Sequence, residues 1–201
     1  MRVVGPAITD SSLAAPTLSR QRERASYGRV MSEFFIPPWT IRTGRLVLTP
    51  VGFQDFEDLC LLKGDPLVYA TMLGGVRSRV QVAAEMAEDA QFWAANGVGM
   101  WLVRDLEGKA DGLTGLHERS DGRGVALRFA FRPETRGRGL AREAAGAALR
   151  FAHDRAHVRR VIAVAGEDNL PSRTVLGSIG MRQTDTFTRG GRLMLIYSSV
   201  A

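Results

Sequence analysis

After about residue 40, hydrophobic and polar positions follow two different periodicities along the chain. Apolar residues at alternate positions, or in short runs between turn-forming residues, predict strands. The segment RLVLTP at 45–50 shows the alternation, and Gly190-Gly191 separates the last two such segments as a hairpin turn. The pattern predicts seven strands, namely 45–50, 100–105, 113–118, 125–131, 160–165 and one on each side of Gly190-Gly191.

Four other segments carry apolar residues at helical spacing. In 53–64, Phe53, Phe56, Leu59 and Leu62 recur every three residues, and Gly64 ends the pattern. The four predicted helices are 53–64, 80–95, 139–156 and 169–180. Because helices and strands are interspersed, the sequence predicts a mixed α/β (α+β) domain.

The first thirty residues show neither periodicity. They are rich in Ser, Ala, Arg and Pro, so we expect residues 1–30 to form a disordered or extended tail. Met31 directly follows this segment, and one hypothesis is that Met31 is the natural start. The tail could instead pack on a partner subunit, so a homodimer stays open. The predicted domain covers residues 31–201.

Composition limits the class of protein. Hydrophobic residues make up 45% and charged residues 24%, as in soluble globular domains. No apolar run approaches the ~18 residues of a membrane span, so we expect no membrane partner. Cys60 is the only cysteine, which excludes an internal disulfide and fits a reducing cytoplasm. One cysteine and three dispersed histidines give no metal-ligand spacing, so no metal is predicted.

The net charge of +6 raises the question of a polyanionic partner. The arginines are scattered along the sequence, and aromatic residues are only 7%, which is few for base stacking. We therefore do not expect a nucleic-acid partner. An RNA- or ribosome-associated basic protein stays as a weaker alternative.

The stretch RPETRGRGLAREA at 132–144 stands between a predicted strand and a predicted helix. Glycines at 137 and 139 let the backbone approach an anion closely, and the first N–H groups of a helix attract one. The motifs of P-loop and dinucleotide-binding proteins are absent, but R/Q-x-x-G-x-G/A matches Arg136, Gly139 and Ala141. The turn could also be a simple connection, with Arg136 and Arg138 as solvated charges.

Four segments in order resemble the GNAT superfamily of acyl-CoA-dependent N-acetyltransferases, and most closely its RimJ/RimL-like branch. They are TGRLVLTP, LTGLH, RPETRGRGLAREA and VAGEDNLPSRTVLGSIGMRQ. The last is similar to the family pattern N-x-x-S-x-x-x-L-x-x-x-G-F, with Met181 in place of Phe. The resemblance covers roughly residues 42–199. It implies a mostly antiparallel seven-stranded sheet with a splayed central strand pair and about four helices.

The resemblance also implies a coenzyme A site. Backbone N–H groups of Gly137, Arg138, Gly139, Leu140 and Ala141 would bind the pyrophosphate, beside the Arg136 side chain. Pantetheine would lie between strands 125–131 and 160–165, bonded to backbone of Ala130 and Phe131. Asn169 would hold a pantetheine amide and Ser172 would lie near the thioester sulfur. Asn169 could instead simply cap the following helix.

The catalytic groups of many relatives are missing. Where they have a tyrosine acid this chain has Leu176, and where they have a glutamate base it has Ala126. His117 and Glu118 remain as candidates, and His117 has the pKa range of a base near neutral pH. His117 could equally be a structural residue at the end of its strand.

We therefore expect an acetyl-CoA-dependent N-acetyltransferase that acts on a primary amine, either a protein N-terminus or a small amine. The alternative is a non-catalytic acyl-CoA-binding or regulatory module. An α-amine has a pKa of about 8, against about 10.4 for lysine, so an enzyme without a strong base favours α-amines. Arg77 and Arg79, expected near the acceptor, predict that polyamines are disfavoured.

Overall fold

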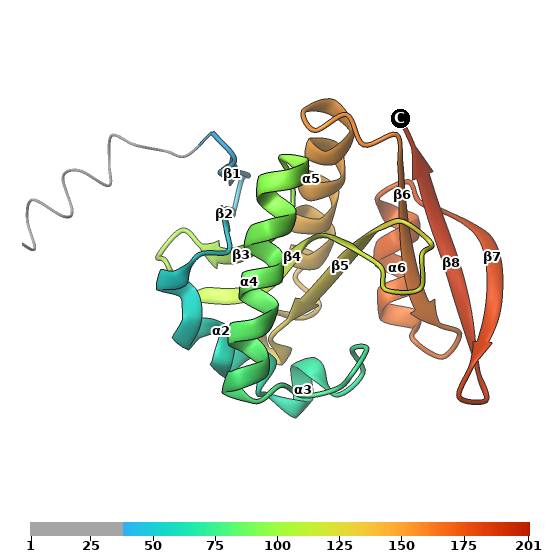
Figure 1. Cartoon of the computed structure of the whole chain (residues 1–201), viewed down its shortest axis with the longest axis horizontal. Coiled ribbons are helices and arrows are strands. Elements are labelled where there is room, and N and C mark those ends of the chain that lie inside the picture. The colour runs from blue at the N-terminus through green and yellow to red at the C-terminus, as the bar shows by residue number, and fades with distance from the viewer. Residues whose placement is uncertain (1–37) are drawn as a thin grey trace, which may run out of the picture. The chain divides into compact units, whose positions relative to one another are not determined.

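The computed structural model describes residues 38–201, so the predictions for residues 1–30 and for Met31 lie outside the described residues. In this range an eight-stranded sheet has the order β1-β2-β3-β4-β5-β6-β8-β7 (Figure 1). Neighbours are antiparallel except for the parallel pair β5 and β6. The strands are Ile41–Arg42, Leu46–Pro50, Met100–Asp105, Ala110–Glu118, Val125–Phe131, Arg160–Gly166, Arg182–Arg189 and Arg192–Val200.

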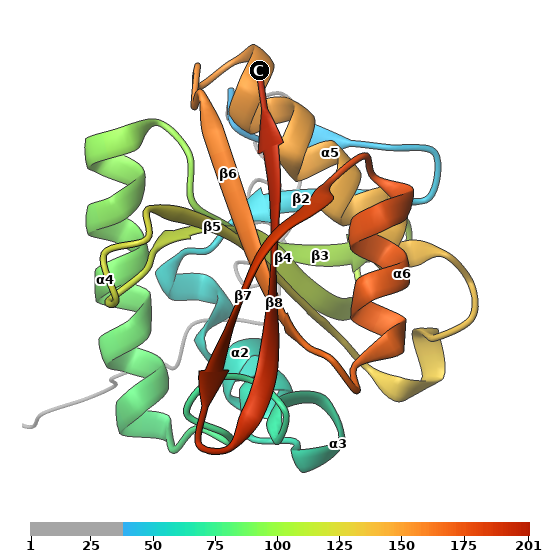
Figure 2. The same ribbon diagram turned by 90° about the vertical axis from the view of Figure 1, so that its right-hand side faces the viewer.

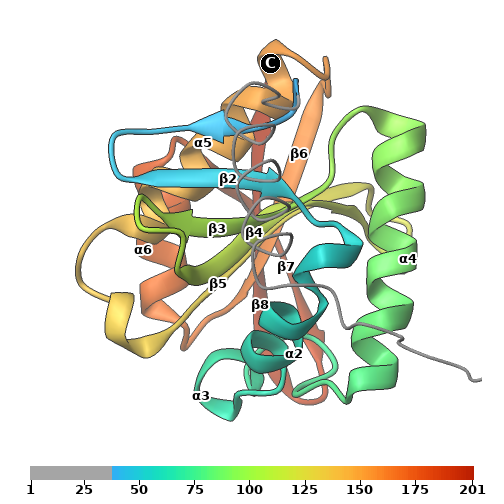
Figure 3. The ribbon, with the colours of Figure 1, turned by 90° about the vertical axis from the view of Figure 1, so that its left-hand side faces the viewer.

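Helices cover both faces of the sheet. Figures 2 and 3 show α4 on one side and α5 with α6 on the other. One apolar cluster joins α2, α3 and α4 to the sheet, and a larger one joins α5 and α6 to it. None of the helices in the described part is long and apolar enough to cross a membrane. The α-helices are α2 (Phe56–Lys63), α3 (Pro66–Tyr69), α4 (Arg79–Asn96), α5 (Leu140–Asp154) and α6 (Leu170–Ser178), with short 3₁₀ turns η1 (Phe53–Asp55) and η2 (Pro133–Thr135).

Local chemistry sets the ends of the long helices. Ser78 and Gln81 form a capping box at the start of α4, and Gly97 ends that helix in the left-handed region with φ of 62°. In α5, alanines 144, 145 and 148 are fully buried, so small side chains bring this helix close to the sheet. A closely packed α5 holds the loop that precedes it.

The mixed, mostly antiparallel sheet of the prediction is confirmed, with small differences in two counts. The sheet has eight strands rather than seven, because Ile41–Arg42 pairs with β2. Two residues are too few to show an alternating pattern. There are five α-helices rather than four, since Asp65 caps the four-residue α3. A single turn of helix shows no periodicity.

The predicted splayed pair is β5 and β6. These parallel strands share a single register pair, Ala126 with Ile162. Each is fully paired on its other side, β5 with β4 and β6 with β8. Beyond Ala126 the two strands separate, which leaves a gap in the middle of the sheet.

Candidate active site

The loop between β5 and α5 has the geometry of an anion site. Gly137 and Gly139 have φ of 73° and 74°, a backbone region that favours glycine. Among the described residues, none of the backbone N–H groups from Gly137 to Arg142 has a hydrogen-bond partner, and the first partnered one is that of Glu143, which donates to Gly139. These N–H groups, at the positive end of α5, can bind a phosphate.

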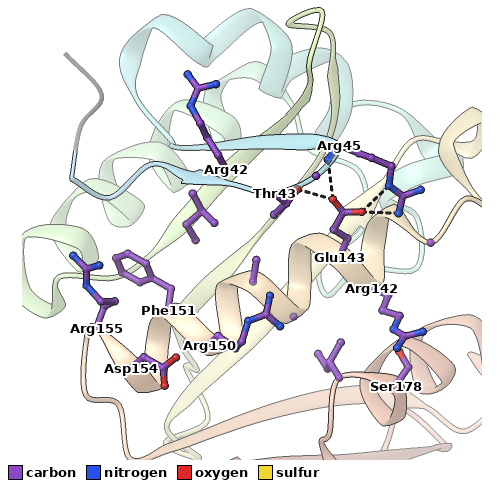
Figure 4. A pocket seen from close by; sticks show the side chains of 16 residues that line it. Arg42, Thr43, Arg45, Arg142, Glu143, Arg150, Phe151, Asp154, Arg155 and Ser178 are labelled. Carbon is purple, nitrogen blue, oxygen red and sulfur yellow. Dashed lines mark hydrogen bonds and ion pairs between the residues drawn. The ribbon is translucent and has the colours of Figure 1, made fainter. Parts of the chain in front are cut away.

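The turn between β1 and β2 braces this loop. Arg45 donates through Nη1 to the carbonyl oxygen of Arg138 at 2.8 Å and through Nε to Glu143 at 2.7 Å. Glu143 also accepts from the Thr43 hydroxyl at 2.6 Å (Figure 4). Because Arg45 binds the Arg138 carbonyl, that peptide group is fixed from a segment about ninety residues away in sequence. This brace was not predicted, since nothing in the sequence pairs residue 45 with residue 138.

The two arginines of the loop differ in their surroundings. Arg136 donates through Nη2 to the carbonyl oxygen of Leu67 at 2.5 Å, so it joins the loop to α3. Arg138 is exposed, and its side chain has no ion-pair partner in the described part of the chain. The structure therefore leaves Arg138 available to an anion, while Arg136 is already engaged with backbone.

A wide groove of about 1010 Å³ runs along the exposed face of α5, which we name the outer groove (Figure 4). It begins at Gly139 and passes between α5 and the β1–β2 turn. Arginines that are scattered in sequence gather here. Those without an ion-pair partner among residues 38–201 are Arg42, Arg142, Arg150 and Arg155.

On the other side of the loop, a groove of about 490 Å³ leads to the gap between β5 and β6. We name it the inner groove, and its lining includes Leu67, Phe129, Arg136, Asn169 and Ser172. Asn169 accepts a hydrogen bond from the Ser172 backbone N–H through Oδ1 at 3.2 Å, so it does cap α6. Its Nδ2 group has no partner among the described residues and can still donate to a ligand in the groove.

Strand register decides which backbone groups face the gap. The Arg132 N–H donates to the Asp111 carbonyl, and the Ala130 carbonyl lies close to Gly112 of β4. Because backbone groups along a strand point alternately to its two neighbours, the even-numbered residues at this end of β5 bond to β4. Phe131 and Phe129 therefore present their N–H and C=O groups to the gap. Of the two predicted residues, Phe131 presents its backbone groups to the gap and Ala130 does not, while Phe129, which was not predicted, presents them as well.

The inner groove continues into a second cavity of about 320 Å³, the gap pocket. The two share Phe129, Asn169 and Ser172. The fully buried Leu176 also lines the gap pocket. The predicted residues Ser172 and His117 thus line one cavity, and Glu118 lies outside it at the exposed end of β4.

His117 is poorly suited to accept a proton in this geometry. Arg128 Nη2 lies 3.1 Å from His117 Nε2. Because arginine can only donate, Nε2 accepts and the ring proton is on Nδ1, which is buried without a partner in the described part of the chain. Burial, with help from Arg128 and Arg119, lowers the pKa of His117 to about 3. The ring is neutral at neutral pH and its lone pair is already occupied.

A third cavity, also of about 320 Å³, lies between α4 and the sheet. We name it the α4 pocket. It meets the gap pocket, since both are lined by Leu73, His117, Arg119 and Arg128. Its other lining residues include Lys63, Glu85, Asp89 and Phe92. The packing of α4 against this part of the sheet is a tertiary contact, so no sequence pattern predicts this pocket.

Each of the two arginines that were expected to form a cationic wall has a carboxylate partner. Arg77 pairs with Glu85. Arg79 donates two hydrogen bonds to the Glu57 carboxylate, at 2.8 Å and 2.6 Å. The charge argument against polyamine acceptors therefore fails. Sequence could not show this pairing, because Glu57 is 22 residues from Arg79.

Comparison with known proteins identifies the family and the fold. Residues 45–182 match the family described as acetyltransferase (GNAT) domain. A GNAT-family acetyltransferase from Bordetella pertussis superposes with a TM-score of 0.70 at 24% identity, over 79% of this chain and 98% of that chain. The ribosomal-protein-S5-alanine acetyltransferase from Vibrio fischeri gives a TM-score of 0.64 at 14% identity, over 80% and 96% of the two chains. The ribosomal-protein acetyltransferase RimL, solved with coenzyme A, gives 0.66 at 13% identity, over 80% and 97%.

The fold and the family match define an acyltransferase of the N-acetyltransferase class. The chain belongs to the GNAT acetyltransferase family, whose domain spans most of its described residues. The ribosomal-protein acetyltransferases among its structural neighbours share this fold. The family uses acetyl-CoA, and in the described part no group of three potential ligands could hold a metal ion.

Proposed function

We propose that this protein transfers the acetyl group of acetyl-CoA to a primary amine, either a protein N-terminus or a small amine. One observation carries the proposal. The unpartnered N–H groups of Gly137 to Arg142 stand at the head of a path that leads through the inner groove to the gap pocket and the α4 pocket. This path has room for a long anionic donor at one end and an acceptor at the other.

Each part of the path has a role in the proposal. The loop N–H groups hold the pyrophosphate, braced by Arg45, and Arg138 supplies positive charge. Phe129 and Phe131 bind the pantetheine amides through free backbone groups, as an added strand would, and Asn169 donates from Nδ2. Ser172 lines both the inner groove and the gap pocket, which suits a hydroxyl that donates to the leaving thiolate.

The acceptor attacks from the α4 side of the gap. The amine must be neutral to attack, and an α-amine with a pKa of about 8 is partly neutral near pH 7.5. Orientation of the two reactants supplies much of the rate enhancement in such a reaction. The Phe129 N–H is placed to stabilise the oxyanion, because donors fixed before the reaction lose no free energy in reorganising.

Thiol release tests the proposal. Purified protein is incubated with acetyl-CoA and a panel of N-terminal peptides, amino-acid amides and polyamines, and free thiol is measured. We expect release that depends on both acetyl-CoA and an amine. The residues Leu176 and Ala126, which replace the acid and base of many relatives, favour the non-catalytic alternative. Calorimetric binding of acetyl-CoA without thiol release for any amine would support that alternative and exclude the enzyme.

A further inference from the structure

The α4 pocket is lined by charged side chains to which the proposed function assigns no role. Its positive side chains are already engaged with protein groups. Lys63 Nζ lies 2.6 Å from Glu85, Arg119 pairs with Asp121, and Arg128 donates to His117. Each of these cations therefore already has a hydrogen-bond or ion-pair partner in the protein.

Three carboxylates of the same pocket have no ion-pair partner among residues 38–201. They are Glu88, Asp89 and Glu118. Glu88 and Glu118 are exposed to solvent, whereas Asp89 is partly buried. Asp89 lies one helical turn after Glu85 on α4, so it shares the face that lines the pocket. Asp89 is thus the unpaired charge most removed from water.

Burial dominates the electrostatics of Asp89. It raises the pKa of Asp89 to about 6, although Lys63 on α2 and Arg128 on β5 act in the opposite direction. Glu85 and Glu88 on α4 raise this pKa further. At neutral pH the group is an ionised and partly desolvated carboxylate, which a cation would stabilise.

We propose that Asp89 binds the ammonium group of the acceptor and accepts its proton before acetyl transfer. This inference rests on the proposed function and names the acceptor end of the same site. The Asp89 carboxylate takes one proton from the ammonium, directly or through a water. The freed amine lone pair forms the C–N bond, the C–S bond breaks, and the second proton that the nitrogen loses passes through the Ser172 hydroxyl or solvent to the leaving thiolate.

The inference also defines the class of acceptor. With Glu88 and Glu118 at its rim, the pocket favours an amine whose neighbouring groups are neutral or positive. A peptide N-terminus or a polyamine fits this description, whereas a free amino acid brings a carboxylate next to the amine. We therefore expect alaninamide to be a better acceptor than alanine.

The test compares Asp89→Asn with Asp154→Asn, which removes an exposed carboxylate at the end of α5, outside the α4 pocket. We expect Asp89→Asn to lower kcat/KM on the order of 10²-fold. It should also abolish the limb of the kcat/KM profile near pH 6, while coenzyme A affinity stays unchanged. Asp154→Asn should keep the limb and stay within about threefold of wild type. A wild-type pH profile in Asp89→Asn, or an equal loss in Asp154→Asn, would overturn the inference.

A second measurement needs neither turnover nor a variant that folds. The Asp89 carboxyl is titrated by NMR in wild-type protein saturated with coenzyme A, with and without alaninamide. We expect its pKa to fall when the ammonium ligand is present. If no amine is acetylated but this pKa still falls, the proposed function fails and the binding of the ammonium stands. An unchanged pKa at saturating alaninamide contradicts the inference even if the enzyme is active.

Discussion

The guanidinium of Arg45 donates a hydrogen bond to the carbonyl oxygen of Arg138, at 2.8 Å, from the outer side of the loop between β5 and α5. The carbonyl is therefore directed away from the inner groove, and Glu143 fixes the same guanidinium at 2.7 Å. The β1–β2 turn therefore fixes this loop on the side opposite to the inner groove. Preorganised donors bind an anion more strongly than mobile ones, because less conformational entropy is lost on binding.

Replacing Arg45 with Met should weaken this brace. We expect the Kd of coenzyme A to rise about tenfold, equivalent to about 1.4 kcal/mol, because the Arg138 peptide and Glu143 lose their shared partner. The matched control is Arg42→Met, since Arg42 lies on β1 next to the same turn and has no ion-pair partner among the described residues. Calorimetry on both variants tests the idea, and equal affinities would contradict it.

Gly139→Val should block coenzyme A binding through the backbone. A Cβ at this position would meet nothing closer than 3.7 Å, so the obstacle is φ of 74° rather than space. A β-branched residue avoids this region at a cost of roughly 1–3 kcal/mol, so the loop should change conformation while the fold persists. Gly177→Val in α6 is the control, because it has open space and no positive φ. Unchanged affinity in folded Gly139→Val would exclude this loop as the phosphate site.

Protonation of His117 should affect the pH dependence of the free energy of unfolding rather than the pH dependence of kcat/KM. Its pKa of about 3 in the folded protein is below its unfolded value of about 6.5, so the unfolded chain binds more protons between these values. Stability is therefore lost as pH falls from 6.5 toward 3, by about 2 kcal/mol between pH 7 and 5. His117→Gln should lack this loss in urea unfolding at the two pH values.

The raised pKa of Asp89 acts in the opposite direction and gives stability as pH falls through 6. For that reason the difference between wild type and His117→Gln is the quantity to compare, not either curve alone. If His117 were the general base, as the sequence suggested, this variant would also lose the limb near pH 6 in kcat/KM. We expect the limb to remain.

Leu176→Tyr tests whether this fold can regain the acid of its relatives. Leu176 is 1% exposed and packs in the core beneath α6, so a larger ring should cost about 1–3 kcal/mol of stability. Leu176→Phe is the control that adds the ring without the hydroxyl. We expect similar decreases in Tm for both and a higher kcat for Tyr than for Phe. Equal kcat values would show that a hydroxyl here does not reach the leaving thiolate.

The sequence predicted those features that depend on short stretches of chain. The glycines at 137 and 139, the Asn169 cap and the long strands follow from local pattern and spacing. Residue pairing across the sheet does not. His117 contacts Arg128 only because β4 and β5 pair in a register that places His117 opposite Ala126. The same register turns the Ala130 backbone away from the gap, which no periodicity in β5 could show.

The electrostatic environment of charged residues was the second feature that could not be predicted from the sequence. Arg77 looked like a free cation in the sequence, yet it pairs with Glu85 on α4. Nothing in the sequence distinguishes Asp89 from the other polar residues of its helix, and its pKa is raised because burial desolvates it. Both effects come from tertiary packing, which is set by where α4 lies and not by its own composition.

The single register pair between β5 and β6 leaves two strand edges exposed inside the domain. Unpaired edges are the part of a β protein that joins with other chains and begins aggregation. A molecule of coenzyme A lying along Phe129 and Phe131 would cover one of them as a substitute strand. The protein should therefore aggregate more slowly on heating and on storage when coenzyme A is present. The aggregation rate should fall as the fraction of molecules with bound coenzyme A rises.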